Sequence, residues 1–347
     1  MRMGAARRAP RLRPHPEPAS GDPGLPRPAA LSGRDMAAPR TPVQWPGLEG
    51  ADERRFGLFV IGDVGIEIRA SLPDVRFTEL DADRLSYAPA RAMVAGTAVN
   101  LARCATRYFS RVGVLGKVGD DDFTPVIRRE LRRIGADDHL RVEPGTANGV
   151  AVMLRDRPRG GGRGARLLVV QDDPPGRRLT EPEVRAAAAG IGAADVLVTD
   201  GYSLLSPVSR EALRAAARTA RDAGTRVAFD LVPHDIDARL PAGAVLPVLA
   251  LADAVISEAP TLARLLGRPV PDGGHEVRGL LPELDRAVPG RPLWLLRFGA
   301  TALERVIAYR RGRLLLEYPT GYGDGVERAG FGDRLAASEL YWWLSGT

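Results

Sequence analysis

The sequence contains very little cysteine and histidine. Cys104 is the only cysteine among 347 residues, so the chain has no second cysteine for an internal disulfide, which fits a reducing cytoplasm. Its apolar helical surroundings favour a small buried hydrophobic residue over a nucleophile. The four histidines are scattered without the spacing of metal ligands, which argues against a zinc site: His15, His139, His234 and His275.

Lysine is almost absent as well. Lys117 is the only one, and every other basic residue is an arginine, which we interpret as the codon bias of a GC-rich genome. The net charge is +6, but the first fifty residues hold eight arginines and four acids and so supply +4, which leaves +2 for the rest. No basic cluster with interleaved aromatic residues is evident, so nucleic acid is not an expected partner.

Long apolar runs are also lacking. The best candidate, residues 243–256, is interrupted by Pro247 and Asp253 and falls short of the ~18 residues that a membrane-spanning helix needs. The arginine-rich N-terminus is not followed by an apolar segment, so it does not read as a secretory signal. These features predict a cytoplasmic protein without a membrane partner.

Residues 1–54 hold ten of the 29 prolines and show no apolar periodicity. This composition predicts a disordered Pro/Arg-rich segment, in which Met36 is an alternative start. Residues 55–347 are predicted to form one domain.

In that domain, short apolar runs alternate with helical patterns. The predicted strands cover residues 56–62, 112–115, 196–199, 227–230, 254–256, 293–298, 306–309 and 314–317. The predicted helices cover residues 97–109, 122–134, 206–223, 260–266 and 331–344. Strands that alternate with helices predict an α/β fold, with a mostly parallel sheet between two layers of helices.

Two stretches depart from this alternation. Residues 71–87 are polar and irregular, whereas residues 150–154 and 167–171 resemble a strand pair joined by a Gly/Arg-rich loop at 158–164. We expect insertions near residues 71–90 and 148–172 to form a small β lid that projects from the main sheet.

The most informative motif is Gly330-Phe331-Gly332-Asp333, at the start of the last predicted helix. Glycines at a helix N-terminus let backbone N–H groups point at an anion, and a carboxylate beside them can accept a proton from an attacking hydroxyl. Phosphoryl transfer needs this combination. The motif alone is weak evidence, because Gly321-Tyr322-Gly323-Asp324 repeats it where no helix follows.

Two further segments could contact a ligand. Gly96 precedes a predicted helix, and Asn100 lies one turn into it, where it could bind sugar hydroxyls. Residues 62–67 follow the first strand and include Glu67, and ligands of open α/β sheets bind outside the carboxyl ends of the strands. An ordinary helix start and a solvated turn are the alternative interpretations.

The order of these segments resembles the ribokinase/phosphofructokinase-B family of carbohydrate and nucleoside kinases, from Phe56 to the C-terminus. The resemblance is carried by the Gly-x-x-x-Asn helix and by four stretches: residues 112–123 (VGVLGKVGDDDF), 131–138 (LRRIGADD), 148–154 (NGVAVML) and 328–340 (RAGFGDRLAASEL). The last is similar to the family signature Asp-Thr-x-Gly-Ala-Gly-Asp.

This resemblance implies a ribokinase-like fold and an ATP- and Mg²⁺-dependent kinase that phosphorylates a hydroxyl of a sugar or nucleoside. Asp333 would be the catalytic base, and Gly330, Phe331 and Gly332 the anion hole. Because lids in such folds often pair, a homodimer through the lid is a candidate assembly. The remaining expected roles are substrate binding by Glu67, Gly96 and Asn100, nucleotide binding by Arg297 and Gly299, and metal binding by Glu258.

Several residues depart from the family pattern. Ala95 replaces the first glycine of the Gly-Gly pair that the family usually has before the Gly-x-x-x-Asn helix. Glu327-Arg328 replaces the Asp-Thr of the C-terminal signature, and residues 258–261 replace a separate family motif, Asn-x-x-Glu. Phe331 replaces a small alanine, and Arg297 a threonine. Only 14 residues follow Asp333, where the family adds helices that wall the adenine pocket, so we expect that pocket to be incomplete, closed by another segment or subunit, or cut short by the gene model.

These departures keep a second hypothesis open, a non-catalytic family member that binds sugar or nucleotide as a sensor or partner subunit. A nicotinamide-dependent Rossmann enzyme is disfavoured, because no Gly-x-Gly-x-x-Gly follows the first strand.

Overall fold

The computed structural model describes residues 54–80, 83, 85–157, 164–322 and 330–346, all within one compact unit that spans residues 42–347. Several predictions lie outside the described residues: the disordered N-terminal segment, most of the loop at 158–164, Gly323-Asp324 and Glu327-Arg328.

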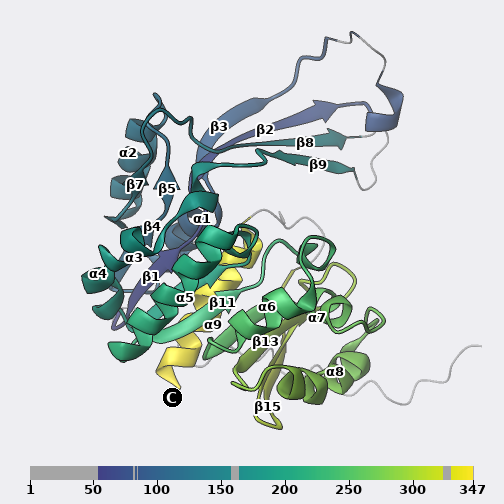
Figure 1. The fold of residues 1–347 in the computed structure, drawn as a ribbon. Helices are drawn as coiled ribbons and strands as arrows, with labels where there is room; N and C mark the ends of the chain where they lie inside the picture. The colour runs from purple at the N-terminus through teal and green to yellow at the C-terminus, as the bar shows by residue number, and fades with distance from the viewer. Residues whose placement is uncertain (1–53, 81–82, 84, 158–163, 323–329, 347) are drawn as a thin grey trace, which may run out of the picture. The chain divides into compact units, whose positions relative to one another are not determined.

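The main sheet has nine strands in the order β15-β14-β13-β12-β11-β10-β1-β4-β6 (Figure 1). The seven strands from β13 to β6 are parallel, and β14 and β15 add an antiparallel hairpin at one edge. Their bounds are β1 Gly57–Ile61, β4 Arg111–Leu115, β6 Asp137–Asp138, β10 Val196–Asp200, β11 Arg226–Asp230, β12 Ala254–Glu258, β13 Leu293–Phe298, β14 Arg305–Arg310 and β15 Arg313–Pro319.

Helices cover both faces of this sheet. On β1, Leu58 and Val60 pack into the cluster with α1, α2 and α9, whereas Phe59 and Ile61 pack into the cluster with the other helices. This alternation follows from the two-residue period of a strand, and it confirms the predicted α/β fold. The helices are α1 Thr97–Ala105, α2 Thr124–Ile134, α3 Glu181–Arg185, α4 Ala188–Gly192, α5 Pro207–Asp222, α6 Ala242–Leu249, α7 Ala259–Leu265, α8 Gly274–Ala287 and α9 Phe331–Ser345.

A second sheet stands apart from the main one at the top of Figure 1, with the strand order β3-β2-β8-β9. We call it the lid. Its strands are β2 Gly65–Pro73, β3 Ala90–Ala95, β8 Val150–Arg157 and β9 Arg166–Val170. The shorter elements are β5 Lys117–Val118, β7 Arg141–Val142 and the 3-10 helices η1 Phe77–Glu79, η2 Pro175–Arg178, η3 Tyr202–Leu204 and η4 Ile236–Ala238.

The prediction of an irregular stretch from residue 71 was wrong at its start, because strand β2 begins at Gly65 and runs to Pro73. The charged residues of this strand made its sequence resemble a polar loop. Glu67 and Arg69 point to the same side of β2 and form an ion pair of 2.7 Å, so each charge offsets the other within the sheet. Their alternation with Ile66 and Ile68 is the signal that sequence reasoning overlooked.

Helix α9 is buried along most of its length, and this burial fixes the position of its first turn. Alanines at the contact, Ala98 and Ala102 on α1 and Ala336 and Ala337 on α9, are fully buried and let the two helices approach closely. Leu340 is also fully buried in this cluster.

Among the described residues, no helix has the length and apolar character to cross a bilayer.

Removing the Leu340 side chain should therefore destabilise the protein strongly. We expect Leu340→Ala to lower the free energy of unfolding by about 2–5 kcal/mol, because it leaves a cavity between α9 and the sheet. Leu314→Ala is the matched control, since Leu314 on β15 is 47% exposed and should cost less than about 1 kcal/mol. Urea denaturation measures both, and equal losses would show that α9 is not packed as described.

Candidate active site

Acidic residues stand at the ends of four neighbouring parallel strands. Asp200, Asp230 and Glu258 are the last residues of β10, β11 and β12, and Asp63 lies two residues beyond β1. The order β12-β11-β10-β1 makes these strands adjacent, so their carboxyl ends share one edge of the sheet. Ligands of open α/β sheets bind at this edge.

Two adjoining cavities open over this edge. The larger, about 840 Å³, is lined by Asp200, Asp230, Glu258 and the first turn of α9, and the smaller, about 230 Å³, by the lid and Asp63. Both share a common wall, so a ligand could occupy the two together. The shared residues are Thr97, Asn100, Arg166, Leu168, Val170, Tyr202 and Gly330.

The first turn of α9 presents backbone donors to the larger cavity. Gly330 has φ 78°, a left-handed conformation that glycine adopts without strain, and it precedes the helix as its N-cap. The first N–H groups of a helix have no partner within the helix, so they can bind an anion. Gly330, Gly332 and Asp333 line the cavity. The Phe331 side chain packs instead against Tyr322, with ring centroids 4.9 Å apart, so only its backbone could serve the site.

Asp333 carries an unusual proton affinity. Burial raises the pKa of its carboxyl group to about 6, and the nearby Arg297 guanidinium partly opposes this rise. A pKa in this range suits a group that must accept a proton near neutral pH.

Arg297 lies beneath the same helix turn and is only 3% exposed. Its Nη2 donates to Oε2 of the buried Glu339 at 3.0 Å, and the Tyr318 hydroxyl donates to Oε1 of Glu339 at 3.0 Å. A Cβ atom added at Gly332 would lie 3.3 Å from Arg297 Nη1, which shows how closely the guanidinium approaches the turn. Arg297 therefore places a fixed positive charge beside the amide donors.

The acids at the strand ends are also perturbed. Burial raises the pKa of Asp230 to about 7, with Asp333 adding to the rise and Arg297 opposing it. Burial and the charge of Asp200 raise the pKa of Asp63 to about 7. Burial raises the pKa of Asp200 as well, although its carboxylate accepts hydrogen bonds from the Thr97 hydroxyl and from Ser203. Such clusters of perturbed acids in a cleft are typical of functional sites.

The predicted substrate residues surround the smaller cavity. Glu67, Gly96 and Asn100 line it, and Asn100 also lines the larger one. Gly96 has φ 106°, and a Cβ there would collide with the Asp63 carbonyl oxygen, so glycine allows α1 to begin against the end of β1. The Asn100 Oδ1 accepts a hydrogen bond of 3.0 Å from Arg103.

The predicted nucleotide-binding residue Gly299 and the predicted metal-binding residue Glu258 differ in their relation to the cavities. Gly299 is outside the lining of both cavities. Glu258 lines the larger cavity, with its Oε1 3.2 Å from His234 Nε2. Thr261, which occupies the position of the family's glutamate, is fully buried and donates its hydroxyl to the His234 carbonyl at 2.8 Å. Thr261 therefore supplies no carboxylate to the site.

The polar groups present fit a magnesium nucleotide. Asp230 Oδ1 and Arg297 Nε are buried without a hydrogen bond to the described residues, and both residues line the larger cavity. Mg²⁺ prefers carboxylate oxygens and phosphates, and the amides of α9 and Arg297 suit phosphate. The described residues include no cluster of three or more metal-ligating side chains.

Sequence reasoning missed part of this lining. Asp200, Asp230, Arg166, Arg177 and Tyr202 were not singled out, yet all line the larger cavity. For the two aspartates a signal was present, because each ends an apolar strand. For the others the sequence offered none, since their positions depend on how the lid returns to the main sheet.

Comparison with known proteins agrees with this architecture. The family model for the pfkB family carbohydrate kinases matches residues 62–286, a span that includes Glu67, Asn100 and Glu258 and ends before Arg297 and Asp333. Solved structures share the fold at low identity. They include adenosine kinase from Sinorhizobium meliloti (19% identity, TM-score 0.64, 84% of this chain and 88% of that one) and fructokinase from Xylella fastidiosa (19%, 0.64, 84% and 82%).

Curated relatives match over shorter stretches. A 2-dehydro-3-deoxygluconokinase of Thermoproteus tenax is 31% identical over 125 residues, which cover 35% of this chain and 37% of the relative. A 5-dehydro-2-deoxygluconokinase of Lacticaseibacillus casei is 24% identical over 180 residues, which cover 51% of each. The chain thus spans about half or less of the length of these relatives.

The family match covers more than half of the chain, and the solved neighbours have the same ribokinase-like fold. The protein therefore belongs to the pfkB family of carbohydrate kinases.

Proposed function

We propose that this protein is an ATP-dependent kinase that transfers the γ-phosphoryl group to a hydroxyl of a sugar or sugar-like substrate, nucleosides included, with Asp333 as the base. One observation carries the proposal. Asp333, the amide-bearing first turn of α9 and Asn100 line one cavity, and that cavity adjoins the one lined by Glu67. A phosphoryl donor and a hydroxyl acceptor could therefore meet at Asp333.

In this proposal the acceptor lies over Gly96 and Asn100, with one hydroxyl directed at Asp333. Asp333 accepts the hydroxyl proton as the acceptor oxygen bonds to the γ-phosphorus and the bond to the departing ADP oxygen breaks. The amides of residues 330–332 and the Arg297 guanidinium stabilise the charge on the transferring group. The lid strands exclude water from the smaller cavity.

ATP and Mg²⁺ are the proposed cosubstrate and cofactor. An Escherichia coli neighbour described as a ribokinase II, 17% identical with a TM-score of 0.64, contains both. In this chain Asp230 and Glu258 would face the metal, and Mg²⁺ would supply the charge that draws the phosphates together. Arg297 would contact phosphate rather than adenine, because its guanidinium is fixed under α9. No role is assigned to Gly299.

A non-catalytic sugar- or nucleotide-binding function is the second candidate. It is favoured by the replacement of the family's Asn-x-x-Glu, because Glu258 is paired with His234 and Thr261 is bound to a carbonyl group. Calorimetry with magnesium-ATP, followed by a phosphotransfer assay over a panel of sugars and nucleosides, distinguishes the two. Binding without turnover for every acceptor would favour this second function.

Replacing the proposed base tests the first function. We expect Asp333→Asn to reduce kcat by about 10²–10⁴-fold while sugar affinity changes little, since the amide keeps the shape of the carboxylate but cannot accept the proton. Initial rates and calorimetry on the same preparation measure both quantities. Unchanged turnover would remove Asp333 from the chemistry.

The pH dependence of turnover is a separate expectation. Asp333 must be ionised to accept a proton, and burial raises its pKa to about 6, so activity should fall as the pH drops through about 6. This acid limb should disappear from the residual rate of Asp333→Asn. Rates measured between about pH 5 and 8 in buffers of constant ionic strength test it, and a limb retained in the variant would belong to another group.

A homodimer through the lid is the assembly that we propose. Strand β9 is the last strand on its side of the lid sheet, and its Leu167 and Val169 are 47% and 54% exposed. Exposed apolar edge strands pair readily with other chains. We expect sedimentation velocity to find a dimer and Val169→Lys to convert it to a monomer, with Val208→Lys on α5 as the exposed control. A wild-type monomer at micromolar concentration would refute this assembly.

A further inference from the structure

Two arginines face the shared hollow from different parts of the fold. Arg166 is the first residue of lid strand β9 and lines both cavities. Arg177 belongs to η2, which follows the lid in the chain, and lines the larger cavity beside Tyr202, a residue common to both. The two arginines thus come from separate elements, and both line the larger cavity, as do Asn100 and Asp333.

Neither arginine is neutralised by a buried carboxylate. The side chain of Arg166 is exposed, and it forms no hydrogen bond or ion pair with any residue that the structure describes. Arg177 donates to the carbonyl oxygen of Asp172, but the carboxylate of that residue is fully exposed and 3.7 Å away. An ion pair with such an exposed carboxylate contributes little to stability. The Nε atom of Arg177 is buried and forms no hydrogen bond to the described residues.

Asp63 does not remove this excess of positive charge. Arg177 lowers the pKa of Asp63, yet burial and Asp200 still raise that pKa to about 7, so Asp63 is only partly ionised near neutral pH. Asp63 is therefore a weaker counter-ion for Arg177 than an exposed aspartate would be.

The other arginines in the lining are already engaged. Arg69 pairs with Glu67 at 2.7 Å, Arg239 with Asp235 at 2.8 Å and Arg297 with Glu339 at 3.0 Å. Arg166 and Arg177 therefore stand out as cations of the hollow whose charge a ligand could satisfy.

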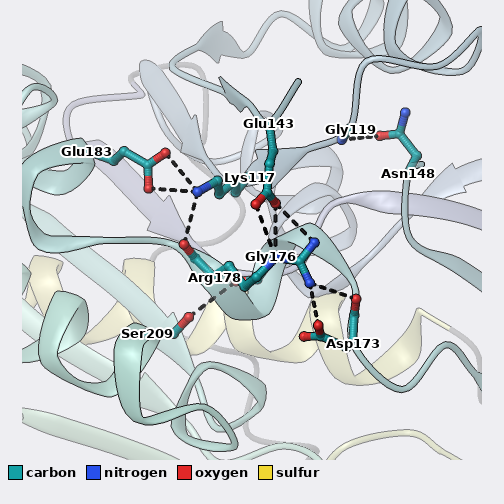
Figure 2. A network of polar contacts seen from close by, with 9 residues as sticks. All are labelled: Lys117, Gly119, Glu143, Asn148, Asp173, Gly176, Arg178, Glu183 and Ser209. Atoms are coloured by element: carbon teal, nitrogen blue, oxygen red, sulfur yellow. Dashed lines mark hydrogen bonds and ion pairs between the residues drawn. The ribbon is translucent and has the colours of Figure 1, made fainter. Parts of the chain in front are cut away.

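A network of polar contacts holds η2 in place. Figure 2 shows the Arg178 guanidinium between the carboxylates of Glu143 and Asp173, and Lys117 beside Glu183. The ion pairs measure 3.0 Å from Arg178 Nη2 to Glu143 Oε2, 2.5 Å from Arg178 Nη1 to Asp173 Oδ2, and 3.1 Å from Lys117 Nζ to Glu183 Oε1. The Lys117 ammonium also donates to the carbonyl oxygen of Arg178 at 3.1 Å. Because its neighbour in the chain is anchored on both sides, the backbone of Arg177 is positioned before any ligand arrives, which lowers the entropic cost of binding.

We propose that the acceptor is a sugar acid, whose carboxylate is bound by Arg166 and Arg177 while one of its hydroxyl groups faces Asp333. This inference rests on the proposed kinase function and names the substrate class of the same site. Guanidinium groups bind carboxylates through short, charge-assisted hydrogen bonds, which fits two arginines that converge on one hollow.

The experiment compares acids with neutral analogues of the same carbon chain. Six-carbon sugar acids, each paired with its alditol (for example D-gluconate with D-glucitol), are tested with the full chain and magnesium-ATP, by initial rates and by calorimetry. We expect the wild type to prefer the acids. Arg177→Gln should lower the acid-to-alditol ratio of kcat/KM by about 10–100-fold, as for loss of a charged hydrogen bond, and adding Arg166→Gln should lower it further.

Arg132→Gln is the matched control, because Arg132 lies exposed on α2 outside both cavities and the variant should keep the wild-type ratio. A wild-type preference for alditols, or an equal loss on acids and alditols in Arg177→Gln, would overturn the inference. Weaker magnesium-ATP binding with an unchanged ratio would assign the arginines to the nucleotide phosphates and overturn it too.

The kinase proposal can fail separately. If the wild type phosphorylates neither the acids nor the alditols nor any member of the sugar and nucleoside panel, the kinase function is wrong, and calorimetry alone then decides the present inference. Acid binding that is lost in Arg177→Gln and kept in Arg132→Gln would support a carboxylate site, whereas no acid binding by the wild type would refute it.

Discussion

Parallel strands that end side by side bring their terminal side chains to one edge, and here four of those side chains are acids. Asp63, Asp200, Asp230 and Glu258 follow from this arrangement, and Asp200 and Glu258 are only 4% and 6% exposed. Ionised carboxylates are costly in such surroundings unless they are paired or protonated. Burial raises the pKa values of Asp63, Asp200 and Asp230, and the Arg297 guanidinium partly opposes this rise at Asp230.

Arg297 links this constraint to the position of α9. Its partner Glu339 lies six residues beyond Asp333 on the same helix, and both members of the pair are almost completely buried. Removing one partner of a buried pair leaves an uncompensated charge, which typically costs about 3–5 kcal/mol, so the pair ties α9 to β13 in a single register. The same contact that satisfies the buried charge also places the first turn of α9, with its amides and Asp333, over the strand ends.

The sequence was sufficient to predict every strand of the main sheet except the two-residue β6. Buried parallel strands such as β10 and β13 are continuous apolar runs, which make them easy to recognise, and the glycine-flanked start of α9 was predicted at Phe331, where the structure places it. Strand β2 was missed because its two charged residues, which form an ion pair in the structure, are typical of a polar loop in the sequence. The roles assigned to Asp333, Glu67, Asn100 and Arg297 remain predictions.

Features that depend on contacts between distant segments were out of reach. The Arg297–Glu339 pair joins positions 42 residues apart, and no local pattern relates them. Arg166 and Arg177 line the same cavity because of the way the chain leaves the lid after β9 and returns to the main sheet through η2. Their sequence neighbours, a Gly/Arg-rich loop and a polar turn, are typical of solvated segments.

The separate supports of the two arginines give the proposed carboxylate site a mechanical consequence. Arg166 belongs to lid strand β9, whereas Arg177 follows the lid in η2, where the contacts of Arg178 with Glu143 and Lys117 hold the chain. An anion that binds both guanidinium groups would join the lid to the main domain across the hollow. A neutral sugar lacks this bridge, so the carboxylate would contribute to closure over the hydroxyl as well as to affinity. Binding energy far from the reacting atom is then used to exclude water at Asp333, which is how remote substrate groups raise turnover rather than affinity alone.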